Sequence, residues 1–369
     1  MTSLSRRAGL AALASFLVSA VLSLSSPAAH AGMTNGPGDC SAHKTVAKDK
    51  KGIALPADDS AAYRPQVVAN GTQTYQWGSA SWKEPAWGCR LVSQTFDFWP
   101  ATGGDPNANH PTIVYFHPDA AGSHVQTSMP LYANVVLPAT TAGFNFVSVE
   151  FRHPVIDQYL ATSLGGQVPH IDTGLAIQYL RAHAKTLGIS SNNIFAFGYS
   201  RGSLSLWQAL QPDLGGGTTG KPSSHVSGFF GYQAQTTYQC DQYGQLFLDP
   251  NDVTTPEYIG NCKATNPYWQ QFGSALDAVS ADSPPVKLQY QQGLELRTGT
   301  QRVIQQVSAP WLVANYEVEH YPDFGIALYD AYLAHGNTHI EYPTPYVPPQ
   351  QQFVGWQAFV TPLLKPDAP

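Results

Sequence analysis

A serine flanked by two glycines is the residue of this sequence best suited to do chemistry. Residues 198–202 read Gly-Tyr-Ser-Arg-Gly and include the end of the short apolar run "NNIFAFG". A nucleophilic serine on a tight strand-to-helix turn needs a small residue on each side, because the two backbones come too close for a Cβ atom. The spacing predicts that Ser200 is a nucleophile; the alternative is a serine that only caps the following helix.

The runs around Ser200 predict alternating strands and helices. "CRLVSQTFDFWP" (89–100) alternates apolar and polar residues, as a half-buried strand does, whereas "PTIVYF" (111–116) and "FNFVSVEF" (144–151) have the continuous apolar character of buried strands. A helix is expected near residues 127–142, and "SLSLWQAL" after the serine also has a helical pattern. This order predicts an α/β fold, with a mostly parallel sheet covered by helices on both faces.

The segment before the nucleophile strand, "IDTGLAIQYLRAHAKTLG" (171–188), predicts a further helix. Gly188 is well placed to end it, because glycine readily adopts the left-handed conformation that closes many helices. Helical spacing puts five apolar residues on one face: Leu175, Tyr179, Leu180, Ala184 and Leu187.

Three stretches resemble the α/β-hydrolase superfamily, specifically its carboxylesterase and hormone-sensitive-lipase-like branch. "YFHPDAAGS" (115–123) follows a buried strand, as the family's His-Gly-Gly-Gly loop does, and "VSVEFRHP" (147–154) looks like the strand that ends in Tyr-Arg-Leu-x-Pro. Residues 172–202 follow the family layout of Asp, helix, Gly-Ile turn and nucleophile. The resemblance covers roughly residues 85–210 and weakens beyond 235. It implies an α/β-hydrolase fold with an inserted lid.

The resemblance also implies an oxyanion hole. Its donors would be the backbone amides of Asp119 and Ala120, joined by the amide of Arg201 after the nucleophile. His117 matches the family histidine and is expected to shape the loop. Pro118 replaces the first glycine, at a position that the family does not use as a donor, whereas a carboxylate at 119 departs from the family pattern and would oppose an oxyanion unless it pointed away.

The catalytic base is harder to assign, because residues 340–369 contain no histidine. In this fold the acid and then the histidine follow the serine. One alignment with the family's last two strands makes Glu319 the acid and "PTPYVPPQQQ" the histidine loop, which supplies no base. A second alignment takes "PPVKLQYQ" (284–291) and "APWLVANY" (309–316) as the last two strands.

The second alignment makes Glu295 the acid and His320 the base, with "THIEYP" (338–343) as an added edge strand. We prefer it because it alone yields a base, although both glutamates remain candidate acids. The other histidines after Ser200 have simpler interpretations. His335 lies at a helix end, His339 lies in a strand-like run, and His225 precedes the strand after the nucleophile.

The N-terminal segment indicates export, which would also explain the four cysteines. Residues 1–31 have the charged start, apolar run and small-residue end of a cleavable signal peptide. Residues 32–84 form an N-terminal extension, whose "TYQWGSASWKEPAWGC" suggests extra strands, and residues 85–369 form the hydrolase domain with a lid at about 235–283. Order along the chain suggests the pairs Cys40–Cys89 and Cys240–Cys262, although the two other pairings stay open. A secreted or periplasmic location is expected.

The functional expectation is a secreted serine hydrolase that cleaves carboxylic esters through an acyl-enzyme on Ser200. The substrate would be a small-molecule or polymer-attached ester. No cofactor is needed, and no metal site is expected because no CxxC spacing or Cys/His cluster is present. The net charge of −6 argues against a nucleic-acid partner, and no membrane span is expected after signal cleavage. The alternative is a pseudo-hydrolase that lost its base and acts as a binding protein.

Overall fold

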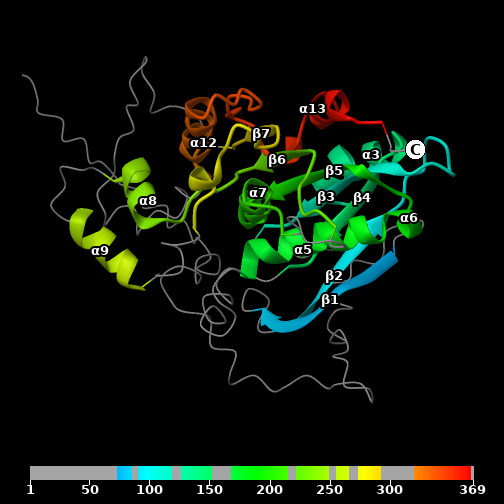
Figure 1. Cartoon of the computed structure of the whole chain (residues 1–369), viewed down its shortest axis with the longest axis horizontal. Coiled ribbons are helices and arrows are strands. Elements are labelled where there is room, and N and C mark those ends of the chain that lie inside the picture. Colours follow the sequence, from blue (N-terminus) through cyan, green and yellow to red (C-terminus); the bar gives the residue numbers. More distant parts are fainter. Residues whose placement is uncertain are drawn as a thin grey trace, which may run out of the picture.

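One mixed sheet forms the centre of the computed structural model (Figure 1). The structure describes residues 73–84, 90–118, 125, 127–151, 168–214, 222–248, 255–265, 273–291 and 320–366. Within these residues, seven strands lie in the order β1-β2-β4-β3-β5-β6-β7. The strands are β1 Gln73–Glu84, β2 Arg90–Trp99, β3 His110–Phe116, β4 Asn145–Val149, β5 Ile189–Tyr199, β6 Gly228–Tyr232 and β7 Val286–Gln289.

The sheet is antiparallel at one side and parallel through the rest. β2 pairs antiparallel with both β1 and β4, while the pairs from β4 through β3, β5 and β6 to β7 are all parallel. The carboxyl ends of five neighbouring strands therefore lie along the same edge. β1 occupies residues where the sequence suggests extra strands, and the buried Trp77 anchors it by donating from Nε1 to the carbonyls of Thr95 (3.0 Å) and Glu150 (3.2 Å).

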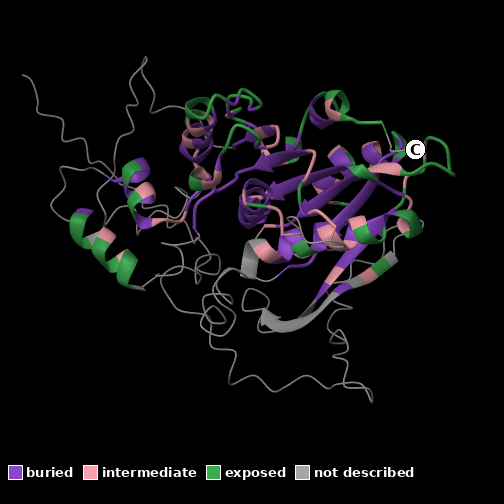
Figure 2. Cartoon of the chain, in the orientation of Figure 1, coloured by how far each residue is buried: buried purple, intermediate pink, exposed green. Residues whose placement is uncertain are grey.

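Alternate residues of the central strands face two separate apolar cores. In β3, Val114 and Phe116 belong to one core, whereas Ile113 and Tyr115 belong to the other. This alternation follows from the two-residue period of a strand. Because both faces of the strands are buried, the strands read as continuous apolar runs, and Figure 2 shows the central strands buried.

Helices cover both faces of the sheet, as the sequence predicts. α5, α7 and α12 pack on the face of Val114, and η4, α3 and α13 pack on the face of Ile113. The helices on the sheet are η4 Tyr132–Val136, α3 Leu137–Thr141, α5 Val168–Ala182, α6 Ala184–Leu187, η5 Ser200–Ser203, α7 Leu204–Leu210, α12 Asp323–Ala334 and α13 Trp356–Val360. Short 3₁₀ turns also occur at η6 Leu276–Ala278, η8 Pro349–Gln351 and η9 Thr361–Leu363.

The buried face of α5 differs from the predicted face. Leu175 is 39% exposed, whereas Ala176 and Ile177 are buried beside Leu180. The reason is the close packing of α5 on α7, where a Cβ at Gly174 would lie 2.7 Å from Cγ of Gln208. Small residues at 174 and 176 permit this approach, so α5 turns them inward and the larger Leu175 outward. Gly188 ends α6 in the left-handed conformation, as expected.

The outer edge of β7 corrects one sequence prediction. Residues 339–347 run parallel to β7 and bond to it directly, with Val286 N donating to His339 O (2.8 Å) and Tyr290 N donating to Thr344 O (2.9 Å). The sequence predicts that residues 309–316 form the last sheet strand beside β7 and that residues 338–343 are an added edge strand. Residues 309–316 lie outside the described residues, but the direct bonds to β7 show that residues 339–347, and not an intervening strand, are its neighbour on this side. Prolines at 343 and 345 suit an edge, where a missing N–H is tolerated.

Two helices, α8 Cys240–Phe247 and α9 Thr255–Thr265, lie in the chain between β6 and β7. Cys240 at the start of α8 is disulfide-bonded to Cys262 in α9, with their Cα atoms 5.9 Å apart. Residues 1–72, which include the expected signal peptide and Cys40, lie outside the described residues, as does Cys89. Among the helices that the structure describes, none combines the length and apolar character needed to cross a membrane.

Replacing both Cys240 and Cys262 by alanine should lower stability by about 3 kcal/mol, because the cross-link restrains the unfolded chain between them. Their separation of 22 residues sets that magnitude. Calorimetry should show a thermal midpoint lowered by roughly 5 °C in a protein of this size. The single Cys262→Ala variant also lacks the cross-link and should match the double variant. A wild-type midpoint in both would show that the bond adds no stability.

Candidate active site

Ser200 stands on a strained turn at the carboxyl end of β5. Its φ of +50° lies in the left-handed region, which non-glycine residues rarely adopt. A Cβ at Gly202 would lie 2.0 Å from the carbonyl oxygen of Phe116 in β3, and a Cβ at Gly198 would lie 2.5 Å from the carbonyl oxygen of Gly202. Both glycines are therefore required by close backbone contacts. The turn has the geometry of a nucleophile elbow.

The strand order and this elbow together identify the architecture. The chain has the α/β-hydrolase fold. The fold class predicted from the sequence is confirmed, and the serine lies at the carboxyl edge of the parallel strands, where such sheets carry their sites.

The side chain of His320 reaches Ser200. Its Nε2 lies 2.8 Å from Oγ of Ser200, so an unprotonated Nε2 would accept a hydrogen bond from the hydroxyl. Ser200 is 7% exposed, and His320 is partly buried. The histidine lies just before α12, and along the chain it comes after β7 and before residues 339–347. Of the histidines considered after Ser200, this is the one that the structure brings to the serine.

The loop where the family's histidine would be sought has a packing role instead. After residues 339–347, the chain turns so that Phe353 is fully buried and contacts Tyr115, Phe197 and Phe230. Asn134 of η4 donates from Nδ2 to Gln350 O (2.7 Å) and holds the turn in place. The loop is thus part of the core on one face of the sheet, and the histidine that contacts Ser200 comes from elsewhere in the chain.

His117 and Glu150 form a buried pair beside the elbow. Nε2 of His117 lies 3.0 Å from Oε1 of Glu150, and its Nδ1 lies 2.9 Å from Pro118 O. Each ring nitrogen of His117 thus meets an oxygen atom, one from the carboxyl group and one from the backbone, so the imidazole is fixed at both nitrogens. This pair ties the end of β3 to the end of β4. The sequence reasoning did not single out Glu150, although an acid inside the apolar run "FNFVSVEF" was an available signal.

The side chain of Arg201 is buried under the elbow. The residue is 2% exposed, and its Nη2 donates to Phe151 O at 2.9 Å. The guanidinium also lies 4.6 Å from the centre of the Phe151 ring, and that ring contacts His117. The residue after Ser200 is therefore anchored to the segment that follows β4. Asp119, Ala120, Glu295 and Glu319 lie outside the described residues.

Two tyrosines flank the elbow on the side of β6. Tyr199 precedes the serine and its ring lies 5.0 Å from that of Tyr232, whose hydroxyl donates to Val347 O (2.8 Å). Burial raises the pKa of Tyr199 above its usual value, and it raises the pKa of Tyr232 as well. Both phenols are therefore neutral at physiological pH and add no charge beside the elbow.

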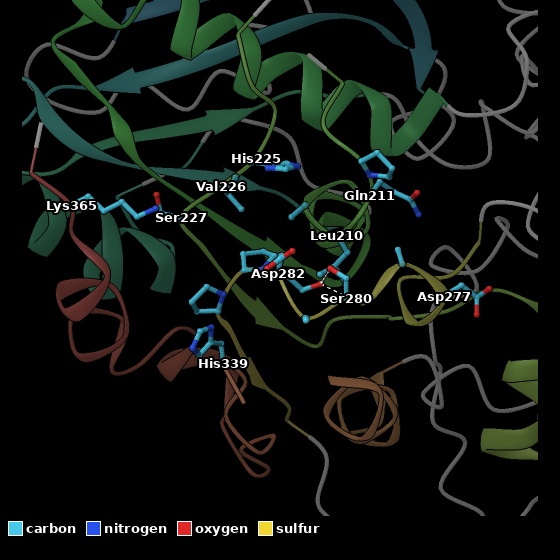
Figure 3. Close-up of a pocket in the computed structure, with 17 residues that line it drawn as sticks. Leu210, Gln211, His225, Val226, Ser227, Asp277, Ser280, Asp282, His339 and Lys365 are labelled. Carbon is cyan, nitrogen blue, oxygen red and sulfur yellow. Dashed lines mark hydrogen bonds between the residues drawn. The ribbon is translucent and has the colours of Figure 1, made fainter. Parts of the chain in front are cut away.

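The remaining histidines lie away from Ser200. His335 ends α12, where its Nδ1 lies 2.9 Å from Ala331 O. His225 and His339 line a pocket of about 820 Å³ (Figure 3). This pocket lies where β6 and β7 begin, at the opposite end of the parallel strands from the serine. Among the described residues, no group of three or more His, Cys, Asp or Glu side chains is arranged to hold a metal ion.

No protein-family model and no curated protein matches the chain. Among solved structures, it is similar to a thermophilic esterase of Thermogutta terrifontis with bound propionate: 16% identity over 77% of this chain and 85% of the other, with a TM-score of 0.45. It is also similar to a truncated carbohydrate esterase from gut microbiota, at 16% identity over 80% of this chain and 96% of the other, with a TM-score of 0.48. Because the sequence identities and TM-scores are this low, the fold assignment rests on the strand order and the elbow described above.

Gly202→Ala should disrupt the elbow, because the added methyl would meet the rigid backbone of β3 at Phe116. We expect a loss of about 2–3 kcal/mol in stability, as for overpacked cores, measured as a lower urea midpoint. Gly260→Ala is the matched control: a Cβ added there would have no atom within 4 Å, and the residue sits within α9. That change should be neutral or add about 0.5–1 kcal/mol. Equal midpoints in the two variants would contradict the close approach.

Proposed function

We propose that this protein is a serine hydrolase that cleaves carboxylic esters. The observation that carries the proposal is the 2.8 Å contact between Ser200 Oγ and His320 Nε2, formed on a strained elbow at the carboxyl edge of the sheet. A serine hydroxyl is a weak nucleophile by itself and becomes effective beside a base that can take its proton. An ordinary helix cap needs neither the positive φ nor the imidazole.

The proposed reaction has two halves. Ser200 Oγ attacks the ester carbonyl while Nε2 of His320 takes the hydroxyl proton and then gives it to the leaving alcohol, which leaves an acyl-enzyme. Water then attacks the acyl group with the same histidine as base, which releases the acid and restores the serine. The two steps balance as the addition of one water to one ester bond. No cofactor takes part.

The oxyanion of each tetrahedral intermediate needs backbone donors. The amide of Arg201, directly after the nucleophile, is one of them, and the amides of Asp119 and Ala120 are the others that the family resemblance implies. The His117–Glu150 pair supports this role, because it holds Pro118 immediately before those two residues. Donors held in place before the reaction are commonly the largest electrostatic contribution to such catalysis.

A glutamate would orient Nδ1 of His320 and stabilise its protonated form. Glu295 follows β7, and Glu319 precedes His320 in the chain, so both remain candidates. The acid should be identified by comparing Glu295→Gln with Glu319→Gln. The variant that lacks the orienting glutamate should show a kcat lower by about 10²–10⁴-fold with little change in KM. The other variant should keep wild-type turnover. Full turnover in both variants would mean that another group orients the histidine.

The proposal makes the enzyme a secreted or periplasmic protein, with residues 1–31 removed as a signal peptide. The Cys240–Cys262 disulfide supports this, because such bonds persist in oxidising compartments. α8 and α9 would form the lid, since they are inserted between β6 and β7. Tyr243 and Phe247 of α8 pack against Phe324 in α12, close to the proposed base. A lid of tyrosines and polar residues suits sugar or aromatic esters better than long acyl chains.

A fluorophosphonate probe tests the function directly, because it reacts with activated serines. The mature protein should be labelled once, and peptide mass spectrometry should find the adduct on Ser200. Ser200→Ala should abolish labelling, and His320→Ala should slow it by about 10³-fold or more. His335→Ala, which changes a distant histidine, is the control and should be labelled at the wild-type rate.

Failure to label would favour the second candidate, a pseudo-hydrolase that binds ligands without cleaving them. The specific observation behind that alternative is the absence of histidine after residue 339. The presence of His320 at the serine weighs against it. If the folded wild-type protein leaves Ser200 unlabelled, and p-nitrophenyl esters are not hydrolysed, the esterase proposal is overturned.

A further inference from the structure

The proposed base and nucleophile belong to different parts of the fold, which must be joined accurately. Ser200 lies at the end of β5, whereas His320 lies before α12, 120 residues later. The loop after residues 339–347 does not supply the histidine, so its position cannot set the catalytic contact. Another connection must hold the start of α12 at the correct distance from the elbow.

Residues 233–237, which we call the β6 loop, contact the elbow on one side. The amide of Gln235 donates to Oγ of Ser203 at 3.2 Å, and Ser203 ends the short helix that Ser200 begins. Trp207 in α7 donates from Nε1 to Gln235 O at 2.9 Å. Both Ser203 and Trp207 are buried. The β6 loop is thus attached to the helix that carries the nucleophile.

The same loop contacts α12 on its other side. Thr236 is fully buried, and its Oγ1 donates to the carbonyl oxygen of Phe324 at 2.8 Å. Phe324 lies in the first turn of α12, and its amide donates to Tyr321 O at 3.3 Å. Tyr321 directly follows His320. The hydroxyl of Thr236 is therefore bonded to Phe324, and only a short, hydrogen-bonded stretch of chain separates Phe324 from His320, the proposed base.

Gln289 at the end of β7 and Tyr290 directly after it contact both the β6 loop and α12. Tyr290 donates from its hydroxyl to Ala234 O at 2.7 Å, and a Cβ at Gly325 would lie 2.7 Å from the Tyr290 ring. Burial, and to a lesser degree the nearby Asp323, raises the pKa of Tyr290 well above its usual value, so its hydroxyl stays a donor. Gln233 has a strained φ of +52° and donates from its amide to Gln289 O at 2.7 Å.

We propose that Thr236 is a positioning residue for the hydrolase reaction. Its hydroxyl joins the elbow, through Gln235 and Ser203, to the first turn of α12, and so it sets the distance between Ser200 Oγ and His320 Nε2. The inference rests on the proposed function. Threonine suits this place because its methyl group fills the core while its hydroxyl bonds a carbonyl that still has a lone pair for the helix.

Thr236→Val tests this role, because valine keeps the shape and removes only the hydrogen-bonding hydroxyl. A displacement of the base by a fraction of an ångström should lower kcat by about 10- to 100-fold, with KM unchanged, and should slow fluorophosphonate labelling in proportion. Thr236→Ser retains the hydroxyl and should recover most of the loss.

Thr140→Val is the matched control. Thr140 is also buried, and its Oγ1 donates to Val136 O at 3.0 Å, but it lies in α3 on the other face of the sheet. Both valine variants lose a comparable buried hydrogen bond, worth about 1 kcal/mol. Only Thr236→Val should lose kcat. If Thr236→Val keeps wild-type kcat, or if Thr140→Val loses as much, the positioning role is overturned.

A spectroscopic measurement separates this inference from the proposed function. In protein labelled with ¹⁵N-histidine, the His320 imidazole signals, assigned with His320→Ala, report the hydrogen bond between Nε2 and Ser200. Thr236→Val should shift these signals and Thr140→Val should not, whether or not the protein hydrolyses esters. Unchanged signals in Thr236→Val overturn the positioning role. If the wild-type protein neither reacts with the fluorophosphonate probe nor hydrolyses esters, but the His320 signals still shift in Thr236→Val, the esterase proposal alone is overturned.

Discussion

The close approach of the elbow to β3 is the constraint on which the site depends. Because Gly202 has no side chain, its backbone lies against the Phe116 carbonyl, and this contact brings the end of β5 beside the end of β3. The same approach places Ser200 in a left-handed conformation with its hydroxyl directed to His320. A larger residue at 202 would separate the strand ends. The conformational strain is offset by the dense core on both sheet faces.

Beside the elbow, Arg201, His117 and Glu150 are buried, and Phe151 contacts both Arg201 and His117. Arg201 bonds to Phe151, whose ring contacts His117, and His117 bonds to Glu150. These contacts connect the carboxyl ends of β3, β4 and β5. Removing one partner from such a group would leave a buried charge or donor unsatisfied, which is costly. The group therefore resists movement of the backbone amides that the proposed mechanism uses.

Two segments in the C-terminal part of the chain have different roles: one packs into the sheet and the core, and the other carries the imidazole that contacts Ser200. Residues 339–347 complete the sheet beside β7, and Phe353 then enters the core between the aromatic rings of Tyr115, Phe197 and Phe230. The imidazole comes from the entry to α12, which the β6 loop joins to the elbow. In this arrangement the last edge of the sheet contributes stability, and the contact geometry of the site depends on α12. This division explains why a search of the last loop for a histidine fails.

The sequence by itself determined the features that arise from neighbouring residues. The glycines around Ser200 predict a turn that only small residues permit, apolar runs predict the buried strands, and Gly188 predicts a helix end. The choice of His320 also came from the sequence, through the chemical need for a base. The tertiary structure alone decided which face of α5 is buried, which segment pairs with β7, and that Glu150 meets His117 and Thr236 meets Phe324. Those outcomes depend on packing between residues far apart in the chain, where several segments have similar local patterns and only the shape of the partner surface selects one.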